Sequence, residues 1–476
     1  MNPPLWQHQL NAIDLATCEL THGRGGFGLW HDMATGKTRT AIEIAILVGA
    51  QRVLVVCPAN VIATWVEQIA EYWMPTIDVR RLDVDPRKRA AILASPLERE
   101  VVIINYESMW RTPSLLKGQF DLVIYDEAHR CKMPSGKQAR FGAKLSTGIP
   151  LRLGLSGTPT PHSPLDAWSV VRLLTPTSPL GFQTYTQFRS RYLRPATYAE
   201  FRDRDLVFSR GRGGDLQRFK MRDLDDLHER IYRIGHRVLA DDVVERPEPQ
   251  DHAIEVDLEP AAIKLYRELE RELTVALGEN TVDAANAMVL VLRLAQLTGG
   301  TLRPEGAASG TVVSTAKEKA LAAFLEDAGG EPVVAFARFH SDLDAVARAC
   351  DAAGVTRLEL SGRVRELEAW QAGGAQVLIA QVASGSEGVD LTRARLAVFY
   401  SVGYSLGQWL QARARIHRPN SKHKIVAYYS LIARGTVDED VYRALSSRRE
   451  VIDALIESHA STRQPGQAVY SGAPNN

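Results

Sequence analysis

Short, mostly apolar runs recur in both halves of this 476-residue chain, and they constrain its fold more than any other feature. The strand candidates are 27–30, 53–57, 101–104 and 122–125 in the first half, and 333–336, 358–360, 377–380, 396–400 and 425–429 in the second. Helical patterns lie between them, for example at 37–48 and 341–353. Continuous β-branched runs bounded by turn residues are typical of parallel strands buried on both faces. The alternation predicts an α/β fold with two parallel-sheet lobes.

The order of these patterns divides the chain into four regions. We expect a first lobe over residues 1–165, a mostly helical and partly basic region over 166–310, and a second lobe over 311–460. Residues 461–476 are rich in Gly, Pro, Ser, Gln and Asn, and this composition predicts a disordered tail. A chain of this length exceeds what one compact core holds, which agrees with several domains.

Composition excludes some classes of protein and leaves one local charge feature. No apolar run reaches the roughly 18 residues of a membrane span, and the N-terminus lacks a signal-peptide pattern. The scattered cysteines form no Cys-x-x-Cys pair, so we expect no zinc site, no disulfides and a cytoplasmic location. The net charge is +1, yet residues 189–222 hold ten Lys/Arg against four Asp/Glu. This stretch is either a nucleic-acid-binding surface or a solvated loop.

A phosphate-binding loop is predicted where the first strand gives way to a helix. Backbone N–H groups at a helix N-terminus favour phosphate, and a Gly-Lys-Thr sequence in this context is typical of such a loop. Lys37 is expected to reach the β- and γ-phosphates, and Thr38 to hold magnesium. The first position of the loop is histidine, where the usual pattern has glycine. The predicted ATP-binding residues are His31, Asp32, Met33, Ala34, Thr35, Gly36, Lys37 and Thr38.

A pair of carboxylates follows the strand at 122–125. Asp126 and Glu127 begin the sequence Asp-Glu-Ala-His, at the carboxyl end of a predicted parallel strand. Ligands bind at this end of the strands in open α/β sheets. Asp126 is therefore expected to hold magnesium, and Glu127 to orient and deprotonate the attacking water.

Two further motifs are weaker alone. Residues 155–160, Leu-Ser-Gly-Thr-Pro-Thr, predict a tight turn whose hydroxyl groups are placed to relay the nucleotide state. In the second half, Arg415 and Arg418 are three residues apart and share one face of a predicted helix. Two guanidinium groups of this kind can neutralise the γ-phosphate as arginine fingers. A basic surface helix is the alternative.

Taken in order, these motifs resemble those of a superfamily-two helicase, and finer features resemble the Swi/Snf-like branch of double-stranded DNA translocases. Residues 5–9 are similar to the adenine-reading glutamine motif, which places Gln9 on the base. Residues 55–58, with Trp65, resemble motif Ia, and 103–107 resemble motif Ib. Residues 383–391 are similar to motif V, with Asp390 where the family more often has Asn, and 411–418 match motif VI.

The resemblance spans roughly residues 5–445 and implies two RecA-like lobes with ATP and Mg²⁺ between them. It adds Gly388 and Asp390 to the ATP site. It also implies nucleic acid, with double-stranded DNA favoured, lying across both lobes of a monomeric motor from a bacterium or a phage. With the basic stretch, the candidate nucleic-acid contacts are Pro58, Asn105, Ser384, Arg189, Arg191, Arg210 and Arg212.

Departures from the family pattern and rival functions stay open at this point. His31, Ala34 and Asn420 differ from the usual residues, which leaves the exact branch undecided. An RNA-directed helicase, or a nucleic-acid-binding scaffold without catalytic activity, fits many of the same motifs. A restriction-type translocase subunit fits less well, because no nuclease constellation is recognisable.

Overall fold

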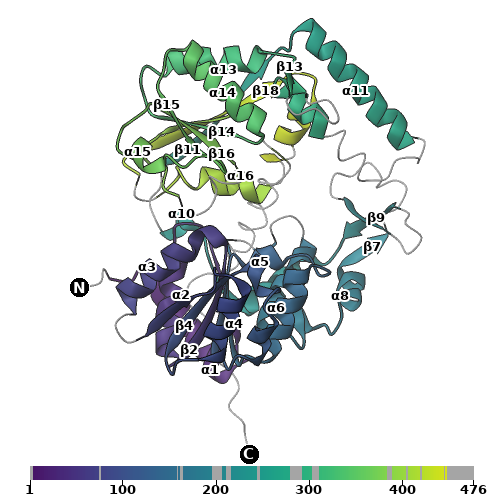
Figure 1. Cartoon of the computed structure of the whole chain (residues 1–476). Helices are drawn as coiled ribbons and strands as arrows, with labels where there is room; N and C mark the ends of the chain where they lie inside the picture. Colours follow the sequence, from purple (N-terminus) through teal and green to yellow (C-terminus); the bar gives the residue numbers. More distant parts are fainter. Residues whose placement is uncertain are drawn as a thin grey trace, which may run out of the picture. The chain divides into compact units, whose positions relative to one another are not determined.

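The protein is described here by a computed structural model. The described residues are 4–73, 77–157, 159–160, 164–195, 206–210, 216–243, 247–278, 292–302, 310–382, 389–401, 403, 406–418, 421–443 and 445–446. The chain divides into two compact units, Met1–Arg246 and Pro247–Asn476 (Figure 1). The predicted boundaries at 165 and 310 do not coincide with this division, because residues from the region between them join the sheets of both units.

The first unit is built on a seven-stranded sheet in the order β10-β1-β6-β5-β2-β4-β3, with every pairing parallel. The strands are β1 (Gly26–His31), β2 (Arg52–Cys57), β3 (Asp78–Arg81), β4 (Glu100–Asn105), β5 (Leu122–Asp126), β6 (Leu151–Leu155) and β10 (Gly235–Val238). The parallel sheet predicted from the apolar runs is therefore confirmed.

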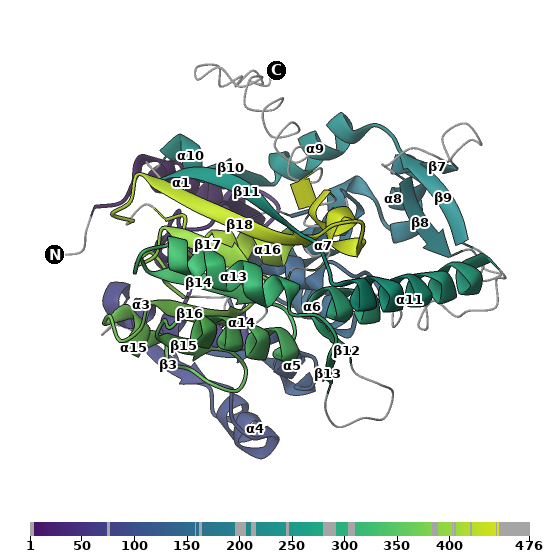
Figure 2. The same cartoon turned by 90° about the horizontal axis from the view of Figure 1, so that it is seen from above.

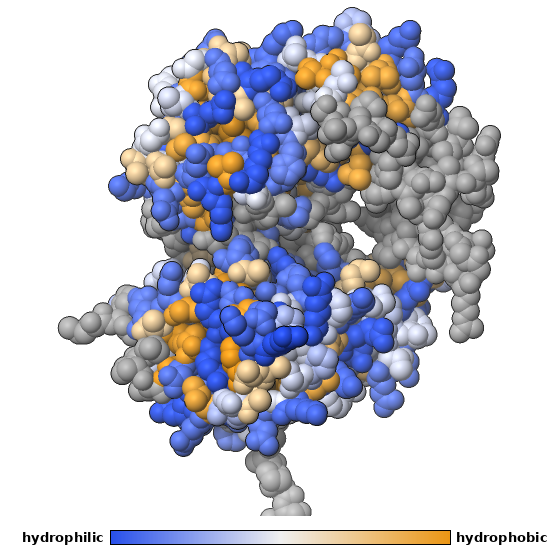
Figure 3. All heavy atoms as spheres, in the orientation of Figure 1, coloured by the Kyte–Doolittle hydropathy of each residue, from blue (hydrophilic) through white to orange (hydrophobic). Residues whose placement is uncertain are grey.

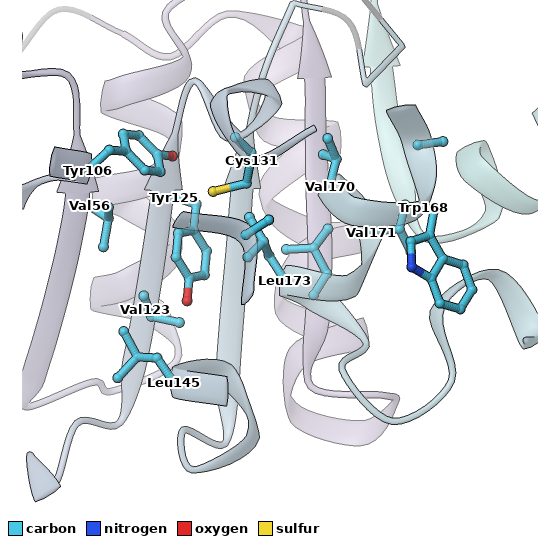
Figure 4. Packing of buried hydrophobic residues seen from close by; sticks show 14 of the residues in the cluster. Val56, Tyr106, Val123, Tyr125, Cys131, Leu145, Trp168, Val170, Val171 and Leu173 are labelled. Carbon is cyan, nitrogen blue, oxygen red and sulfur yellow. The ribbon is translucent and has the colours of Figure 1, made fainter. Parts of the chain in front are cut away.

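Helices cover both faces of this sheet, and the side chains of each central strand alternate between two cores. In β2, Leu54 and Val56 join one core, and Val53 and Val55 join the other. Figure 4 shows Val56 among the aromatic and aliphatic side chains of the first core. Because both faces are buried, the strands need continuous apolar sequence.

The helices and minor strands of the first unit have the following bounds. They are α1 (Gln7–His22), α2 (Lys37–Leu47), η1 (Ala59–Val61), α3 (Ile62–Tyr72), α4 (Pro86–Ala94), α5 (Tyr106–Met109), η2 (Pro113–Lys117), η3 (Ala128–Cys131), α6 (Lys137–Thr147), η4 (Pro164–Asp166), α7 (Ala167–Leu174), η5 (Pro179–Gly181), α8 (Tyr185–Tyr192), β7 (Leu193–Pro195), β8 (Leu206–Arg210), β9 (Leu216–Met221), α9 (Leu224–Arg233) and α10 (Ala240–Val243). Strands β7, β9 and β8 form a small antiparallel sheet in that order.

The second unit holds a six-stranded parallel sheet in the order β11-β18-β17-β14-β16-β15 (Figure 2). The strands are β11 (Glu248–Val256), β14 (Val333–Ala337), β15 (Arg357–Leu360), β16 (Val377–Gln381), β17 (Leu396–Phe399) and β18 (Ile425–Ala433), with a hairpin of β12 (Thr301–Leu302) and β13 (Thr311–Val312). The helices are α11 (Pro260–Gly278), α13 (Ala316–Asp327), α14 (His340–Ala352), α15 (Leu367–Gln371) and α16 (Leu406–Arg413). The second predicted lobe is thus also an α/β unit with a parallel sheet.

Strands β10 and β11 were not predicted, because the region that contains them has a mostly helical pattern. Both are edge strands with a single sheet neighbour, and most of their residues are exposed or half-buried, so their sequences lack a continuous apolar run. Gly235 permits β10 to pair closely with β1, since a Cβ there would lie 2.4 Å from the carbonyl oxygen of Gly28. The first sheet is therefore completed by a strand about 200 residues beyond β1.

The surface fits a chain in which 24% of the residues are charged. Hydrophilic residues cover much of the face seen in Figure 3, with smaller hydrophobic patches between them. Among the described residues, no helix has both the length and the apolar character needed to cross a bilayer. The cysteines Cys18, Cys57, Cys131 and Cys350 form no disulfide bonds.

Candidate active site

The predicted phosphate loop joins β1 to α2 at the carboxyl edge of the first sheet. Gly36, the N-cap of α2, has a φ of 78°, and Ala34 has a φ of 63°. A Cβ on Gly36 would also lie 2.4 Å from Nε2 of Gln9, so both backbone conformation and space favour glycine. No side chain caps α2, which leaves its first N–H groups directed at the loop. This arrangement suits a phosphate group.

Lys37 holds the loop together in this structure. Its Nζ donates to the carbonyl oxygens of His31 and Asp32, each at 2.9 Å. Thr38 follows in the first turn of α2 and is half-buried. The ammonium group therefore lies inside the loop, where phosphate oxygens can replace the two carbonyl oxygens as its partners.

Gln9 lies against the phosphate loop from the side of α1. Its Nε2 donates to the carbonyl oxygen of Gly36 at 3.3 Å, and its Oε1 accepts from the backbone N–H of Trp6 at 2.9 Å. These contacts place the glutamine beside the nucleotide loop, as the resemblance implies. Its role in reading the adenine base stays a prediction.

A cluster of three histidines under the loop was not foreseen. His31 is fully buried, and its Nε2 lies 3.1 Å from Nδ1 of His236 on β10. Nε2 of His8 lies 2.9 Å from the carbonyl oxygen of Thr35. Burial, and then the neighbouring His236 and Lys37, lower the pKa of His31 to about 2. Burial thus favours the neutral form of the histidine at the first loop position, and its contact with ATP stays a prediction.

Asp32 links the same loop to the end of β10. Its backbone N–H donates to the carbonyl oxygen of Val238 at 2.9 Å, and its Oδ2 accepts from the N–H of Ala240 at 3.2 Å. The phosphate loop is therefore hydrogen-bonded to the strand and helix that end the first unit. Nothing in the local sequence of either segment signals this pairing, because the partners are about 200 residues apart.

Asp126 ends β5 and is anchored from two sides. Its Oδ2 accepts from Nε1 of Trp65 at 2.8 Å, and its backbone carbonyl oxygen accepts from the hydroxyl of Tyr106 at 2.7 Å. Burial and then the charge of Glu127 raise the pKa of Asp126 to about 6, while the Trp65 hydrogen bond and the Lys37 charge oppose the rise. Strands β1 and β5 both pair in parallel with β6, so the two motifs that follow them lie at the same edge of the sheet.

Glu127 starts η3 in the left-handed region, with a φ of 51°. Non-glycine residues adopt this conformation rarely, and such strain is often found at functional sites. Nδ1 of His129 lies 3.2 Å from Oε2 of Glu127 and 3.1 Å from Oγ of Ser156. The Ser156 turn therefore contacts the carboxylate motif through His129. The relay of the nucleotide state by this turn stays a prediction. Thr158 of the same turn lies outside the described residues.

The predicted arginines of the second unit, Arg415 and Arg418, both follow α16, which ends at Arg413. The prediction that they share one face of a helix is therefore wrong, because the chain turns out of the helix before it reaches them. Arg415 is buried, and its carbonyl oxygen accepts from the N–H of Leu391. Arg418 donates from Nη2 to the carbonyl oxygen of Val389 at 2.7 Å and lies near Asp390. Motifs V and VI therefore meet in this unit. Gly388, predicted to bind ATP, lies outside the described residues.

The candidate nucleic-acid contacts are placed unevenly. Pro58 directly precedes η1, and Oδ1 of Asn105 accepts from the N–H of Ser108 at 2.7 Å as the cap of α5. Arg189 lies over the ring of Phe219, and Arg191 pairs with Asp223 and Asp226. Ser384 and Arg212 lie outside the described residues, as does the side chain of Arg210 at the end of β8. Their contacts with nucleic acid stay predictions.

The hydrogen bond from Trp65 to Asp126 leads to the first testable prediction. Trp65→Phe keeps the buried ring but removes the donor to Asp126, which leaves a buried carboxylate oxygen without that partner. Such a loss costs about 1–3 kcal/mol. We expect kcat/KM for Mg²⁺-ATP to fall about tenfold or more, with a higher half-saturating Mg²⁺ concentration in an ATPase titration.

Trp30→Phe is the matched control for this variant. Nε1 of Trp30 donates to the carbonyl oxygen of Ile231 at 3.3 Å, and its ring is fully buried. This control should lower stability but leave the Mg²⁺ dependence unchanged. Equal Mg²⁺ dependence in Trp65→Phe and the wild type would show that Trp65 does not position Asp126.

The burial of His31 predicts that the free energy of unfolding decreases at acidic pH. Its pKa in the folded chain, about 2, lies below the ordinary 6.5, so below pH 6.5 only the unfolded chain takes up this proton. Stability is therefore lost as the pH falls, by about 2 kcal/mol between about pH 7.5 and pH 5. In His31→Gln this contribution should vanish from urea unfolding curves of the full chain. His22→Gln, at an exposed histidine of α1, should leave the acid-dependent loss at its wild-type size.

Comparison with known families agrees with this geometry. The family model for the SNF2-related domain matches residues 8–298, which is more than half of the chain. The model for the helicase conserved C-terminal domain matches residues 316–420. The two matches fall in the order that the motifs predict.

Individual relatives are distant. A putative protein, p41, of Acyrthosiphon pisum secondary endosymbiont phage 1 is 26% identical and covers 90% of this chain and 94% of its own length. An uncharacterized ATP-dependent helicase of Mycoplasma pneumoniae is 25% identical over 85% of this chain, which spans only 37% of that protein. The SWI2/SNF2 ATPase core of Sulfolobus solfataricus, solved in complex with double-stranded DNA, is 20% identical, covers 96% of this chain and 93% of its own, and has a TM-score of 0.44. The resemblance inferred from the motifs is confirmed by the family match, and the chain belongs to the SNF2-related family of superfamily-two helicases.

Proposed function

We propose that this chain is a nucleic-acid-dependent ATPase that couples ATP hydrolysis to movement along duplex DNA. The observation that carries the proposal is that Lys37 at the uncapped start of α2 and Asp126 at the end of β5 lie at the same edge of the first sheet, since β1 and β5 both pair in parallel with β6. A cation, free N–H groups and a carboxylate in this arrangement suit a nucleoside triphosphate. Membership of the SNF2-related family supports the same conclusion.

The nucleotide would be held by residues of the first unit. Lys37 would exchange its two carbonyl partners for phosphate oxygens, and Gln9 would lie near the base. The Thr38 hydroxyl and the Asp126 carboxylate are oxygen ligands of the kind that Mg²⁺ prefers. Magnesium, when bound, supplies positive charge that neutralises the phosphates. Glu127 would orient the attacking water and accept its proton.

Arg415 and Arg418 would complete the site from the second unit. Their guanidinium groups would stabilise the charge that develops on the γ-phosphate, so hydrolysis would require the two units to close on the nucleotide. Nucleic acid that favours the closed arrangement would then stimulate hydrolysis by shifting the population of states. Repeated opening and closing would move the protein along its track.

Duplex DNA is the proposed track, and the names of several relatives support it. The similar proteins include the chicken DNA repair and recombination protein RAD54B, 24% identical, and a mouse chromodomain-helicase-DNA-binding protein, 26% identical. The chain spans about half of each of these proteins. Contacts should be mostly to phosphates, because a motor must tolerate any sequence.

One panel of assays tests the proposal. ATP hydrolysis by the purified protein is measured with duplex DNA, single-stranded DNA and RNA, beside strand-displacement and triplex-displacement assays. We expect duplex DNA to stimulate hydrolysis most, triplex displacement to require ATP, and the stimulation to weaken steeply with salt. Stronger stimulation by RNA would favour the RNA-directed alternative, and no hydrolysis under any condition would favour the scaffold.

A further inference from the structure

Arg418 is tied to its own unit through every part of its guanidinium group. Nη2 donates to the carbonyl oxygen of Val389 at 2.7 Å, and Nε donates to that of Ala414 at 3.4 Å. Nη1 lies 3.8 Å from Oδ2 of Asp390. Burial lowers the pKa of Arg418, and the charge of Asp390 opposes this effect. The carboxylate therefore stabilises the half-buried guanidinium group in the resting arrangement.

Asp390 is a fixed partner for this arginine. Its Oδ1 accepts from the backbone N–H of Thr392 at 2.9 Å and from the hydroxyl of the same residue at 2.7 Å. Its backbone carbonyl oxygen accepts from Nε2 of Gln371 at 2.8 Å. One carboxylate oxygen thus belongs to a local turn, and this turn directs the other oxygen towards Arg418.

The pair differs from the neighbouring arginine–aspartate pair of the same unit. Arg413 is bidentate to Asp251 and packs over the rings of Trp409 and Tyr428, so it is held as part of the core. The Arg418–Asp390 contact is longer, with side chains 20% and 35% exposed. Partly exposed pairs of this kind are weak, so a phosphate group can replace the carboxylate.

We infer that Asp390 is a positioning residue that holds Arg418 on the second unit at rest and competes with the γ-phosphate for its guanidinium group. The inference rests on the proposed function, in which Arg418 stabilises charge on that phosphate. Without nucleic acid, the Asp390 contact keeps hydrolysis slow. Nucleic acid favours closure, and closure favours the phosphate contact, so part of the stimulation is release of this arginine.

The variant Asp390→Asn tests the inference directly. The amide oxygen can still accept from Thr392, so the turn is retained while the negative charge is removed. We expect kcat without nucleic acid to rise about fivefold, which corresponds to ~1 kcal/mol. At saturating duplex DNA, kcat should change by less than about twofold. The stimulation ratio therefore falls, an effect that loss of structure does not produce.

Two further variants serve as controls. Asp351→Asn makes the same change in an exposed pair, where Oδ2 of Asp351 lies 3.0 Å from Nη2 of Arg357, and should leave both rates unchanged. Asp390→Asn combined with Arg418→Ala should show no rise above Arg418→Ala alone. If Asp390→Asn lowers the unfolding midpoint, Asp390→Ser replaces it, because a serine hydroxyl can also accept from Thr392.

The outcomes separate this inference from the function on which it rests. An unchanged or lower basal rate in a well-folded Asp390→Asn protein overturns the inference, and so does a rise that persists without Arg418. If Arg418→Ala alone keeps full DNA-stimulated hydrolysis, the proposed role of Arg418 is wrong and the inference fails with it. If Arg418→Ala abolishes stimulation while Asp390→Asn changes nothing, only the inference fails.

Discussion

Lys37→Ala should lower kcat/KM for ATP by at least about a hundredfold, the size of effect that follows loss of one preorganised charged donor. The ammonium group is the cation bound within the phosphate loop, where it now bonds the carbonyl oxygens of His31 and Asp32. In the variant, neither the phosphates nor these carbonyl oxygens have that partner. Steady-state hydrolysis with saturating duplex DNA measures the loss.

The control for this variant is Lys264→Ala, which removes an exposed lysine of α11. It should retain wild-type kcat/KM, which would show that the loss of one positive charge is not sufficient to lower ATP hydrolysis. Circular dichroism and the unfolding midpoint confirm that Lys37→Ala is folded. Full DNA-stimulated hydrolysis by a folded Lys37→Ala protein would mean that residues 31–38 are not the phosphate loop.

Glu127→Gln should lower kcat by about a thousandfold while ATP binding is retained, because a positioned general base contributes about 10²–10⁴ in rate. Glutamine keeps the size of the side chain, and it removes the carboxylate that would accept the proton of water. Hydrolysis is measured beside the binding of a fluorescent ATP analogue. Kd for the analogue should stay within about threefold of the wild-type value. A tenfold weaker Kd would require a loss of about 1.4 kcal/mol of binding free energy.

Glu43→Gln provides the matched carboxylate-to-amide change on α2. Glu43 forms a long ion pair with Arg39, 3.8 Å apart, away from the loop. Its hydrolysis rate should equal that of the wild type. A Glu127→Gln protein that keeps more than about a tenth of its kcat would exclude Glu127 as the general base, since such a group contributes at least about a hundredfold.

The sequence patterns predicted the centre of each sheet and the edge strand β15, and missed the other three edge strands, β3, β10 and β11. Strands such as β2 and β14 are buried on both faces, so they need continuous apolar residues that are visible in the sequence. The edge strand β3 reads Asp-Val-Arg-Arg, and β10 and β11 are also largely polar. Their strand conformation depends on neighbours that are distant in sequence, and such tertiary dependence is not written in a local pattern.

The candidate site was likewise only partly predictable from the sequence. The convergence of Lys37 and Asp126 was predictable, because carboxyl ends of parallel strands meet at one edge of a sheet. The contact between His31 and His236 was not, because 205 residues separate them and neither lies in a motif that names the other. The partner of Arg418 at rest was likewise invisible, since a motif specifies which residues occur and not which ones they contact before the nucleotide arrives.

The late pairing of β10 with β1 has a consequence for how this protein can be divided. A fragment that ends at residue 165 would contain both the phosphate loop and the carboxylate pair. It would also leave the hydrogen-bonding edge of β1 unpaired and Asp32 without its partners at Val238 and Ala240. An exposed strand edge of this kind invites association with other chains. The shortest fragment that retains the β10–β1 pairing and the partners of Asp32 therefore extends through α10. Gene fusions or domain exchanges that keep this unit intact must place their junction after α10.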